Sequence, residues 1–327
     1  MIIILFKRLF VSVIQQCFCD LLSVKILFKR LLTIKSQQDI ISKEVRQDMT
    51  NFENKAYQLK LNSDYYVVTA NDLIKGRQKM SLREAQLLYI TMAQIVKEDT
   101  DFKTYTVSVP ELAKFMQIAP DSLYRDLESI CTNLLQRVVK IQISDGDGSN
   151  KDRKWKAFQW ISYAAYEEGK LTIRLNDEMK PFLIDLMSHY SQILLGTLCA
   201  FNSYYTARLY QLIVCEKGEH PNVTKEEWSF TCEEIRDFFQ IDKHEYSRPH
   251  DLIKKTIKSA IEELNNSDFV HIWDYEELRD TGRGRPLKGV RFKAMLFKDK
   301  NEKNWYFERA LPQIEQFKAD KKSQKTL

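Results

Sequence analysis

Residues 247–297 constrain the fold most, because a helix pattern there is followed directly by two strand patterns. Ser247, Arg248 and Pro249 form a helix-start signal, since serine caps free N–H groups and proline fits the first turn. Apolar residues then recur at spacings of three and four, which places them on one face: Ile253, Ile257, Ala260, Ile261 and Leu264. The other face carries Asp251, Lys254, Lys255, Lys258 and Glu262. The pattern predicts an amphipathic helix with a mostly basic open face.

The periodicity changes to two after Asn265 and Asn266. Phe269–Tyr275 and Gly289–Phe297 alternate as strands do, and a loop with arginine and glycine joins them. A helix followed by a hairpin with a basic tip is typical of a winged helix, a unit that binds DNA.

The loop at Thr281–Pro286 contains Gly-Arg-Gly-Arg-Pro and resembles the AT-hook, an element that lies along a narrow A·T minor groove. Glycine lets the backbone approach the groove floor, where the negative potential attracts Arg283 and Arg285. We expect this loop and the preceding helix to contact DNA together.

The same order of patterns occurs twice. TVSVPELAKFMQI (Thr106–Ile118) aligns with SFTCEEIRDFFQI (Ser229–Ile241) at an offset of 123, and Leu127 and Leu134 align with Ile257 and Leu264 at an offset of 130. Two copies of one fold explain both matches. The expected fold class is α+β, with two tandem winged-helix domains related by an internal repeat, at residues 66–176 and 177–298. We call the helix expected at residues 249–265 the reading helix, because it is the one expected to contact DNA. The corresponding helix of the first copy keeps only Arg125 as a basic residue on its open face.

Other elements follow from local signals. Ser81 and Glu84 form a capping box before a helix that we expect to reach Val96. Strands are expected at Val138–Ser144, Trp155–Tyr166 and Lys170–Leu175, and helices at Glu178–Met187 and from Ser203 to Glu216. A strand at Glu227–Thr231 and a helix at Cys232–Phe239 complete the second half.

The net charge of the chain says little about what the protein binds. Of the +5 total, residues 1–48 contribute eight Lys/Arg and four Asp/Glu, which leaves 42 against 41 for the rest. Local clusters of lysine and arginine decide phosphate binding, because only nearby charges release counterions from DNA. The six cysteines lack metal-ligand spacing, which favours free thiols in a reducing cytosol.

The two ends differ from the middle. Residues 1–48 form an apolar and basic leader in which charged residues interrupt every run long enough to span a bilayer, and no signal-peptide cleavage site follows. We interpret it either as an amphipathic extension or as a segment that is not translated because the protein begins at Met49. Residues 299–327 read as a polar tail with a short helix around Ala310–Lys318.

Motifs for catalysis are absent from the sequence. The five histidines form no metal-binding pair, no phosphate-binding loop follows a strand, and no serine has a nucleophile-elbow context. Carboxylate pairs such as Glu262 and Glu263 are expected on a solvated helix face. We therefore expect no enzyme, no metal and no cofactor.

Four stretches carry a family resemblance: VVTANDLIKGRQKMSLREAQLLYITMAQI from Val67, YRDLESICTNLLQRVVKI from Tyr124, FNSYYTARLYQLI from Phe201, and EEIRDFFQIDKHEYSRPHDLIKKTIKSAIEELNN from Glu233. With the hairpin ending GVRFKAMLF, they resemble the RepB-type replication initiators of iteron-bearing, theta-replicating plasmids. Ser203–Tyr210 is the most specific of them. Within it Tyr205, Leu209 and Tyr210 are expected in the core, and Arg208 either in an internal ion pair or at a phosphate.

The resemblance implies a cytoplasmic bacterial protein that binds repeated double-stranded sites, the iterons, at a plasmid origin. It also implies a homodimer in equilibrium with the monomer, origin opening, and recruitment of host helicase and a DnaA-type initiator, with no membrane partner. The candidate DNA contacts are Arg125, Arg208, Arg248, His250, Lys254, Lys255, Lys258, Arg283, Arg285, Lys288 and Arg291. A winged-helix transcriptional repressor is an alternative, and a rolling-circle nicking enzyme is disfavoured because it needs a histidine–metal pair.

Overall fold

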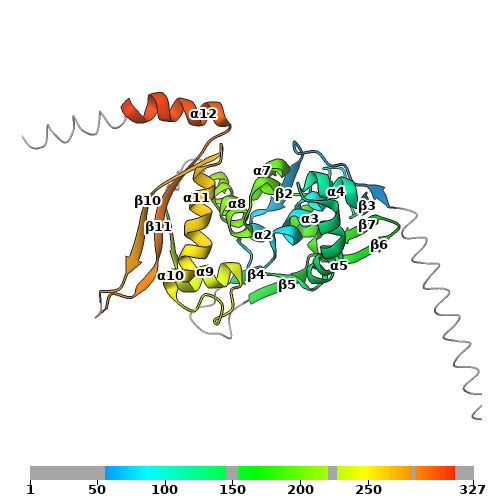
Figure 1. Cartoon of the computed structure of the whole chain (residues 1–327), viewed down its shortest axis with the longest axis horizontal. Helices are drawn as coiled ribbons and strands as arrows, with labels where there is room; N and C mark the ends of the chain where they lie inside the picture. The colour runs from blue at the N-terminus through cyan, green and yellow to red at the C-terminus, as the bar shows by residue number, and fades with distance from the viewer. Residues whose placement is uncertain (1–55, 145–153, 220–226, 282–283, 314–327) are drawn as a thin grey trace, which may run out of the picture. The chain divides into compact units, whose positions relative to one another are not determined.

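A computed structural model describes residues 56–144, 154–219, 227–281 and 284–313 (Figure 1). All elements from Tyr57 onward belong to one compact unit. The leader of residues 1–48 and the last part of the tail lie outside the described residues.

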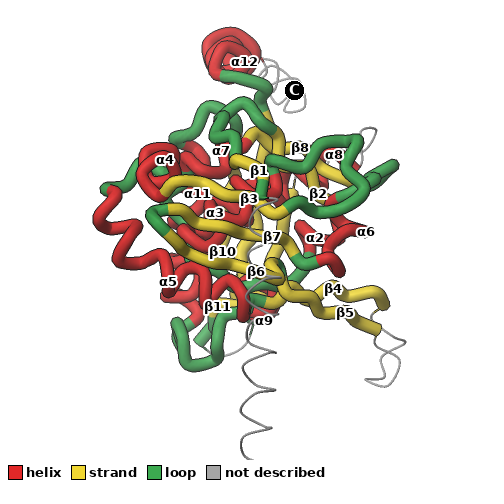
Figure 2. The backbone as a smooth tube through the Cα atoms, turned by 90° about the vertical axis from the view of Figure 1, so that its right-hand side faces the viewer, coloured by secondary structure: helices red, strands yellow, loops and turns green. Residues whose placement is uncertain are grey.

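The first copy of the repeat is built from strands and two helices. Its elements are β3 (Thr104–Ser108), α4 (Val109–Phe115), α5 (Pro120–Gln136), β6 (Ile161–Glu167) and β7 (Lys170–Leu175). The strands form a sheet in the order β1-β3-β7-β6, in which the short β1 (Tyr57–Gln58) runs parallel to β3 and the other pairs are antiparallel. Figure 2 shows this sheet with α4 and α5 beside it.

The second copy repeats that arrangement. Its elements are β9 (Glu227–Thr231), α9 (Cys232–Phe239), a long helix, β10 (Val270–Arg279) and β11 (Leu287–Leu296). The long helix has three parts, α10 (Pro249–Ile253), the π-helical η2 (Lys254–Lys258) and α11 (Ser259–Asn265). The order β10-β11-β9 is the counterpart of β6-β7-β3, so the repeat seen in the sequence is a repeat of structure.

Equivalent residues have equivalent roles in the two copies. Ser108 and Thr231, which are 123 residues apart, both cap the following helix by accepting a hydrogen bond from the third backbone N–H. Gln117 and Gln240 then both take the left-handed conformation after the helix, with φ of 53° and 51°. The later offset of 130 has a structural cause, because residues 242–248 are an insertion of the second copy.

The insertion connects the second copy to Lys79, which lies just before α3. The Arg236 guanidinium donates to the carbonyl oxygens of Asp242 at 2.9 Å and Glu245 at 2.8 Å, and it also donates to that of Tyr246. Glu245 then forms an ion pair with Lys79 at 2.6 Å.

Further elements surround the repeat. They are β2 (Tyr66–Ala70), α2 (Asn71–Lys75), α3 (Leu82–Met92), β4 (Val138–Ser144), β5 (Lys154–Gln159), η1 (Asp177–Met179), α6 (Lys180–Leu183), β8 (Tyr190–Leu194), α7 (Leu195–Ala200) and α8 (Tyr204–Glu219). β2 pairs with β8 in an antiparallel ladder, and β4 pairs with β5 in a separate hairpin. Residues 190–194 therefore share a sheet with residues 66–70, a pairing that the sequence patterns did not indicate.

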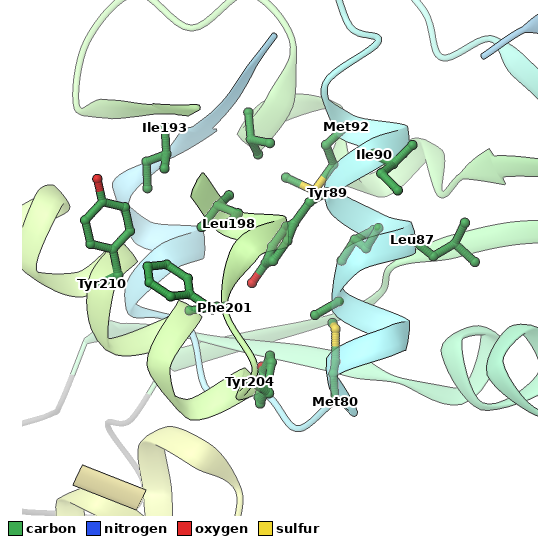
Figure 3. Packing of buried hydrophobic residues seen from close by; sticks show 14 of the residues in the cluster. Met80, Leu87, Tyr89, Ile90, Met92, Ile193, Leu198, Phe201, Tyr204 and Tyr210 are labelled. Carbon is green, nitrogen blue, oxygen red and sulfur yellow. The ribbon is translucent and has the colours of Figure 1, made fainter. Parts of the chain in front are cut away.

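The core around α3, α7 and α8 is apolar and closely packed (Figure 3). The predicted capping box at Ser81 and Glu84 starts α3, whose Leu87, Leu88 and Ile90 are fully buried. The Tyr89 hydroxyl satisfies its buried polar atom with Gln211 of α8 at 3.2 Å. Leu209 and Tyr210 are buried and Tyr205 is half-buried, which confirms the core role expected for them.

Several predicted boundaries were wrong. The helix expected to reach Val96 ends at Met92. The helix expected to reach Met187 ends at Leu183, because Ile184 is extended and Asp185 has a φ of 55°. The helix of the tail starts ten residues earlier than expected, at Lys300, and comprises α12 (Lys300–Trp305), the π-helical η3 (Tyr306–Ala310) and residues 311–313.

Among the helices of the described ranges, none combines the length and the apolar character that crossing a bilayer requires.

Candidate nucleic-acid interface

The long helix at Pro249–Asn265 separates apolar and basic side chains as its sequence predicts. Arg248 has extended backbone angles before the helix, and Pro249 occupies the first helical position. Leu252, Ile253 and Ile257 are buried, and burying each such side chain contributes roughly 1.5–3 kcal/mol. This burial fixes the rotation of the helix about its axis, so Lys254, Lys255 and Lys258 are exposed together.

The three lysines form no ion pair with any other residue that the structure describes. Their ammonium groups are therefore free to replace counterions on a phosphate backbone. Arg248, by contrast, contacts Asp251 at 2.6 Å, and His250 Nδ1 lies 3.7 Å from the same carboxylate. The hydrogen bond from Arg248 lowers the pKa of Asp251.

The wing is the hairpin of β10 and β11, and its tip is closed by a hydrogen bond from Asp280 N to Pro286 O at 3.0 Å. Gly284 has a φ of 83°, and no atom lies within 4 Å of the position of a Cβ there. Arg285 is exposed with a φ of 40°. Gly282 and Arg283 lie outside the described residues. The tip therefore presents Arg285 to solvent, as the AT-hook resemblance requires.

Two other predicted contacts on the wing are held by carboxylates. Lys288 forms an ion pair with Asp280 at 2.9 Å. Arg291 pairs with Glu276 at 2.5 Å and lies 3.8 Å from Glu227, and these carboxylates raise its pKa. Both side chains must leave or share these partners before they bind a phosphate.

The first copy differs in charge. The exposed face of α5 carries Arg125, which pairs with its neighbour Asp126 at 3.0 Å, beside Asp121 and Glu128. Its wing turn, at Glu167–Lys170, also begins with two glutamates. The surface equivalent to the basic helix is therefore mostly acidic.

Arg208 was predicted as a DNA contact, and the structure corrects this prediction. Its side chain is buried, with 1% of the residue exposed, so it cannot reach a phosphate. Its Nη2 donates to the carbonyl oxygens of Ile74 at 2.7 Å and Gly76 at 2.9 Å. It is thus an internal residue that binds carbonyl oxygens, which differs from both roles considered from the sequence.

Two charged residues hold the end of the reading helix, and neither role was predicted from the sequence. Glu263 was expected in solvent, but it accepts hydrogen bonds from Asn202 N at 2.5 Å and from the Thr206 hydroxyl at the start of α8. Lys303 of α12 donates to Ser267 O and, at 3.0 Å each, to Asn265 O and Val270 O. No local signal marks either residue, because their partners are distant in the sequence.

The residues that the structure describes give no sign of metal-binding or thiol chemistry. The described histidines, cysteines and carboxylates do not gather in any group of three or more that would hold a metal ion. Cys131, Cys199 and Cys232 are free thiols, and burial raises the pKa of Cys131 to about 11 and that of Cys199 to about 12. Cys17 and Cys19 fall in the leader, outside the described residues.

Fold and charge together define a tandem winged-helix protein whose second copy carries the basic helix and wing. Two family models match the chain, "Initiator Replication protein, WH1" over residues 66–214 and "Initiator Rep protein, WH2" over residues 231–294. The chain belongs to this family of replication initiator proteins, which confirms the predicted family and fold class. The first family model continues past residue 176, and the domain boundary expected there stays a prediction.

Individual relatives agree with this assignment. A replication initiation protein of Escherichia coli is 23% identical over 240 residues, which cover 72% of this chain and 71% of the relative. The crystal structure of the Pi initiator protein in complex with iteron DNA matches with a TM-score of 0.52 and 18% identity, over 73% of this chain and 100% of that chain. At this identity the second likeness concerns the fold.

Proposed function

We propose that this initiator acts on a bacterial plasmid, in the cytoplasm, by binding repeated double-stranded sites at the origin through its second copy. The observation that carries the proposal is the free lysine cluster on the long helix of that copy. An α-helix fits the major groove, where lysine and arginine meet the acceptor atoms of guanine. The Pi initiator protein, which has the same fold, was crystallised in complex with iteron DNA, and this supports the same kind of site here.

In this proposal the contacts divide into three groups. Lys254, Lys255 and Lys258 meet bases or phosphates in the major groove, with Arg248 and His250 near the start of the helix. Arg283 and Arg285 enter an A·T-rich minor groove beside it. Lys288, Arg291 and Arg125 have carboxylate partners, as Arg248 has in Asp251, and contribute less to binding than the three lysines.

The first copy has a supporting role in the proposal. Because its α5 is mostly acidic, this copy reads no bases in the proposal. It touches adjoining DNA backbone and contacts another chain of the same protein, in a dimer that is in equilibrium with the monomer. Origin opening and recruitment of host helicase and a DnaA-type initiator follow from the family's role in starting replication. The chain itself is proposed to carry out no catalytic step.

Footprinting on the plasmid that encodes the protein tests the proposal. We expect a ladder of evenly spaced protected repeats upstream of the gene, and the ladder should vanish when Lys254, Lys255 and Lys258 are all changed to alanine. Lys114→Ala, on an exposed lysine of α4, is the control and should leave the ladder intact. Absence of protection by the wild-type chain would end the proposal, and strand cleavage in the presence of a divalent metal would contradict the non-catalytic role.

A further inference from the structure

The hairpin of β4 and β5 belongs to the first copy alone. It lies between α5 and β6, whereas the second copy passes from α11 to β10 through residues 266–269. A winged helix therefore folds without it, and its surface is free to serve another purpose. Figure 2 shows the hairpin standing out from the helices near it.

One face of the hairpin exposes a tryptophan. Val139 and Ile141 point inward and are buried, while Trp155 lies on the outward face opposite Gln142 with 55% of its surface exposed. The Lys140 ammonium lies 4.6 Å from the centroid of the Trp155 ring. A large exposed indole is unfavourable in water, so a partner that covers it would gain free energy.

The charge of the hairpin indicates the chemistry of that partner. Its described strands contain Lys140, Lys154 and Lys156 and no acidic residue, and these lysines form no ion pair with another described residue. Lys140 shares the face of Trp155, while Lys154 and Lys156, its neighbours in the sequence, alternate to the other face of the strand. The connecting residues 145–153 lie outside the described ranges and add three aspartates, one lysine and one arginine, so the whole hairpin is still positive. The surface therefore complements phosphate.

The hairpin is tied to the second copy at its base. Arg77 and Lys140 exchange backbone hydrogen bonds of 2.8 and 2.9 Å. The Arg77 guanidinium then forms an ion pair of 2.7 Å with Asp237 of α9.

We propose that the β4–β5 hairpin binds single-stranded DNA, with an unpaired base stacked on Trp155 and a phosphate on Lys140 beside it. A duplex presents base edges in its grooves, whereas an unpaired base presents the ring face that an indole can cover. The proposal extends the proposed function, because origin opening produces single strands, and the tie through Arg77 keeps the hairpin next to the copy that reads the duplex.

The test compares two exposed tryptophans. Trp155→Ala is measured beside Trp305→Ala, whose side chain in α12 is similarly exposed at 56%, with fluorescent oligothymidylate and a duplex origin repeat as separate probes. Trp155→Ala should weaken oligothymidylate binding about 5- to 150-fold, the loss typical of one base–aromatic stack. Its duplex binding should stay the same, Trp305→Ala should bind both probes normally, and Trp155→Phe should retain most of the single-strand affinity.

Three outcomes would overturn the inference. Equal single-strand affinity of wild type and Trp155→Ala would rule out stacking of a base on Trp155. Equal losses of affinity by Trp155→Ala for the oligothymidylate and the duplex would indicate that Trp155 contacts the duplex. No single-strand binding by wild type, together with weaker self-association of Trp155→Ala in sedimentation, would assign the hairpin to a protein contact. Each of these leaves duplex binding by the wild-type chain intact, so the proposed function is tested separately. Thermal unfolding of both variants checks that they are folded.

Discussion

The guanidinium of Arg208 lies 4.6 Å from the centroid of the Phe238 ring. Arg208 belongs to α8 and Phe238 to α9, and the same guanidinium binds the carbonyl oxygens at the end of α2. The buried guanidinium of Arg208 thus connects α9 of the second copy to the end of α2. This contact makes Arg208 a structural residue of the initiator rather than a DNA contact.

Arg208→Ala should lower the free energy of unfolding by about 2–4 kcal/mol, because it leaves buried carbonyl oxygens without donors and removes the cation–π contact. The salt dependence of DNA binding by the folded fraction should not change. Denaturant unfolding and a salt series measure the two effects. Arg125→Ala, on an exposed side chain, should leave stability nearly unchanged, and a smaller salt slope for Arg208→Ala would restore the phosphate role.

Lys258→Ala should weaken binding to the origin repeat by roughly 1–3 kcal/mol if Lys258 reads a base, with discrimination lost at one position of the repeat. Binding to a panel of single-base variants of the repeat measures this. An equal loss across all variants would show that Lys258 contacts phosphate alone, and unchanged affinity would place the helix away from the DNA.

Changing both Arg283 and Arg285 to alanine should reduce the preference for A·T flanks. It should also lower the slope of the salt dependence by about one to two units, because binding releases fewer counterions from the DNA when these two positive charges are missing. Repeats with A·T and G·C flanks, titrated at several salt concentrations, measure both quantities. The double change to lysine keeps the charge and should restore the slope more than the flank preference. An unaltered slope in the alanine variant would mean that the wing does not touch DNA.

Lys303→Met should destabilise the second copy by about 1–2 kcal/mol, because three carbonyl oxygens around the end of α11 lose a charged donor. Amide exchange at Leu264 and Asn265 should become faster. Lys300→Met is the matched control on an exposed position of the same helix. Equal exchange rates in the two variants would show that α12 does not hold the reading helix.

Lowering the pH should also loosen the contact between η3 and β10. His271 stacks against Trp273 and touches Phe307, and burial, followed by the charge of Lys303, lowers its pKa. The unfolded chain therefore takes up this proton at a higher pH than the folded chain, since an ordinary histidine has a pKa of about 6.5. Stability from this residue is complete above about pH 6.5 and is lost as the pH falls below it.

Unfolding midpoints across this pH range test the effect. The His271→Gln variant should show a weaker decrease in acid than the wild type, while His244→Gln, at an exposed position, should behave as the wild type does. The same acid dependence in wild type and His271→Gln would contradict the assignment.

Local patterns predicted the second copy well. β9 and α9 begin and end where the periodicity placed them, and the long helix covers Pro249–Asn265. Prediction failed where tertiary contacts decide the conformation. The pairing of β8 with β2 joins segments about 120 residues apart, and the end of α6 depends on the left-handed Asp185 rather than on a glycine or proline.

The sequence by itself determined the two copies of the fold and the rotation of the reading helix, because apolar spacing sets which face a helix buries. Tertiary structure decided which charges are free to bind. Lys258 and Lys303 look alike in the sequence, and so do Arg208 and Arg285. One member of each pair meets carbonyl oxygens from distant parts of the chain and the other faces solvent, and only the folded packing makes that distinction.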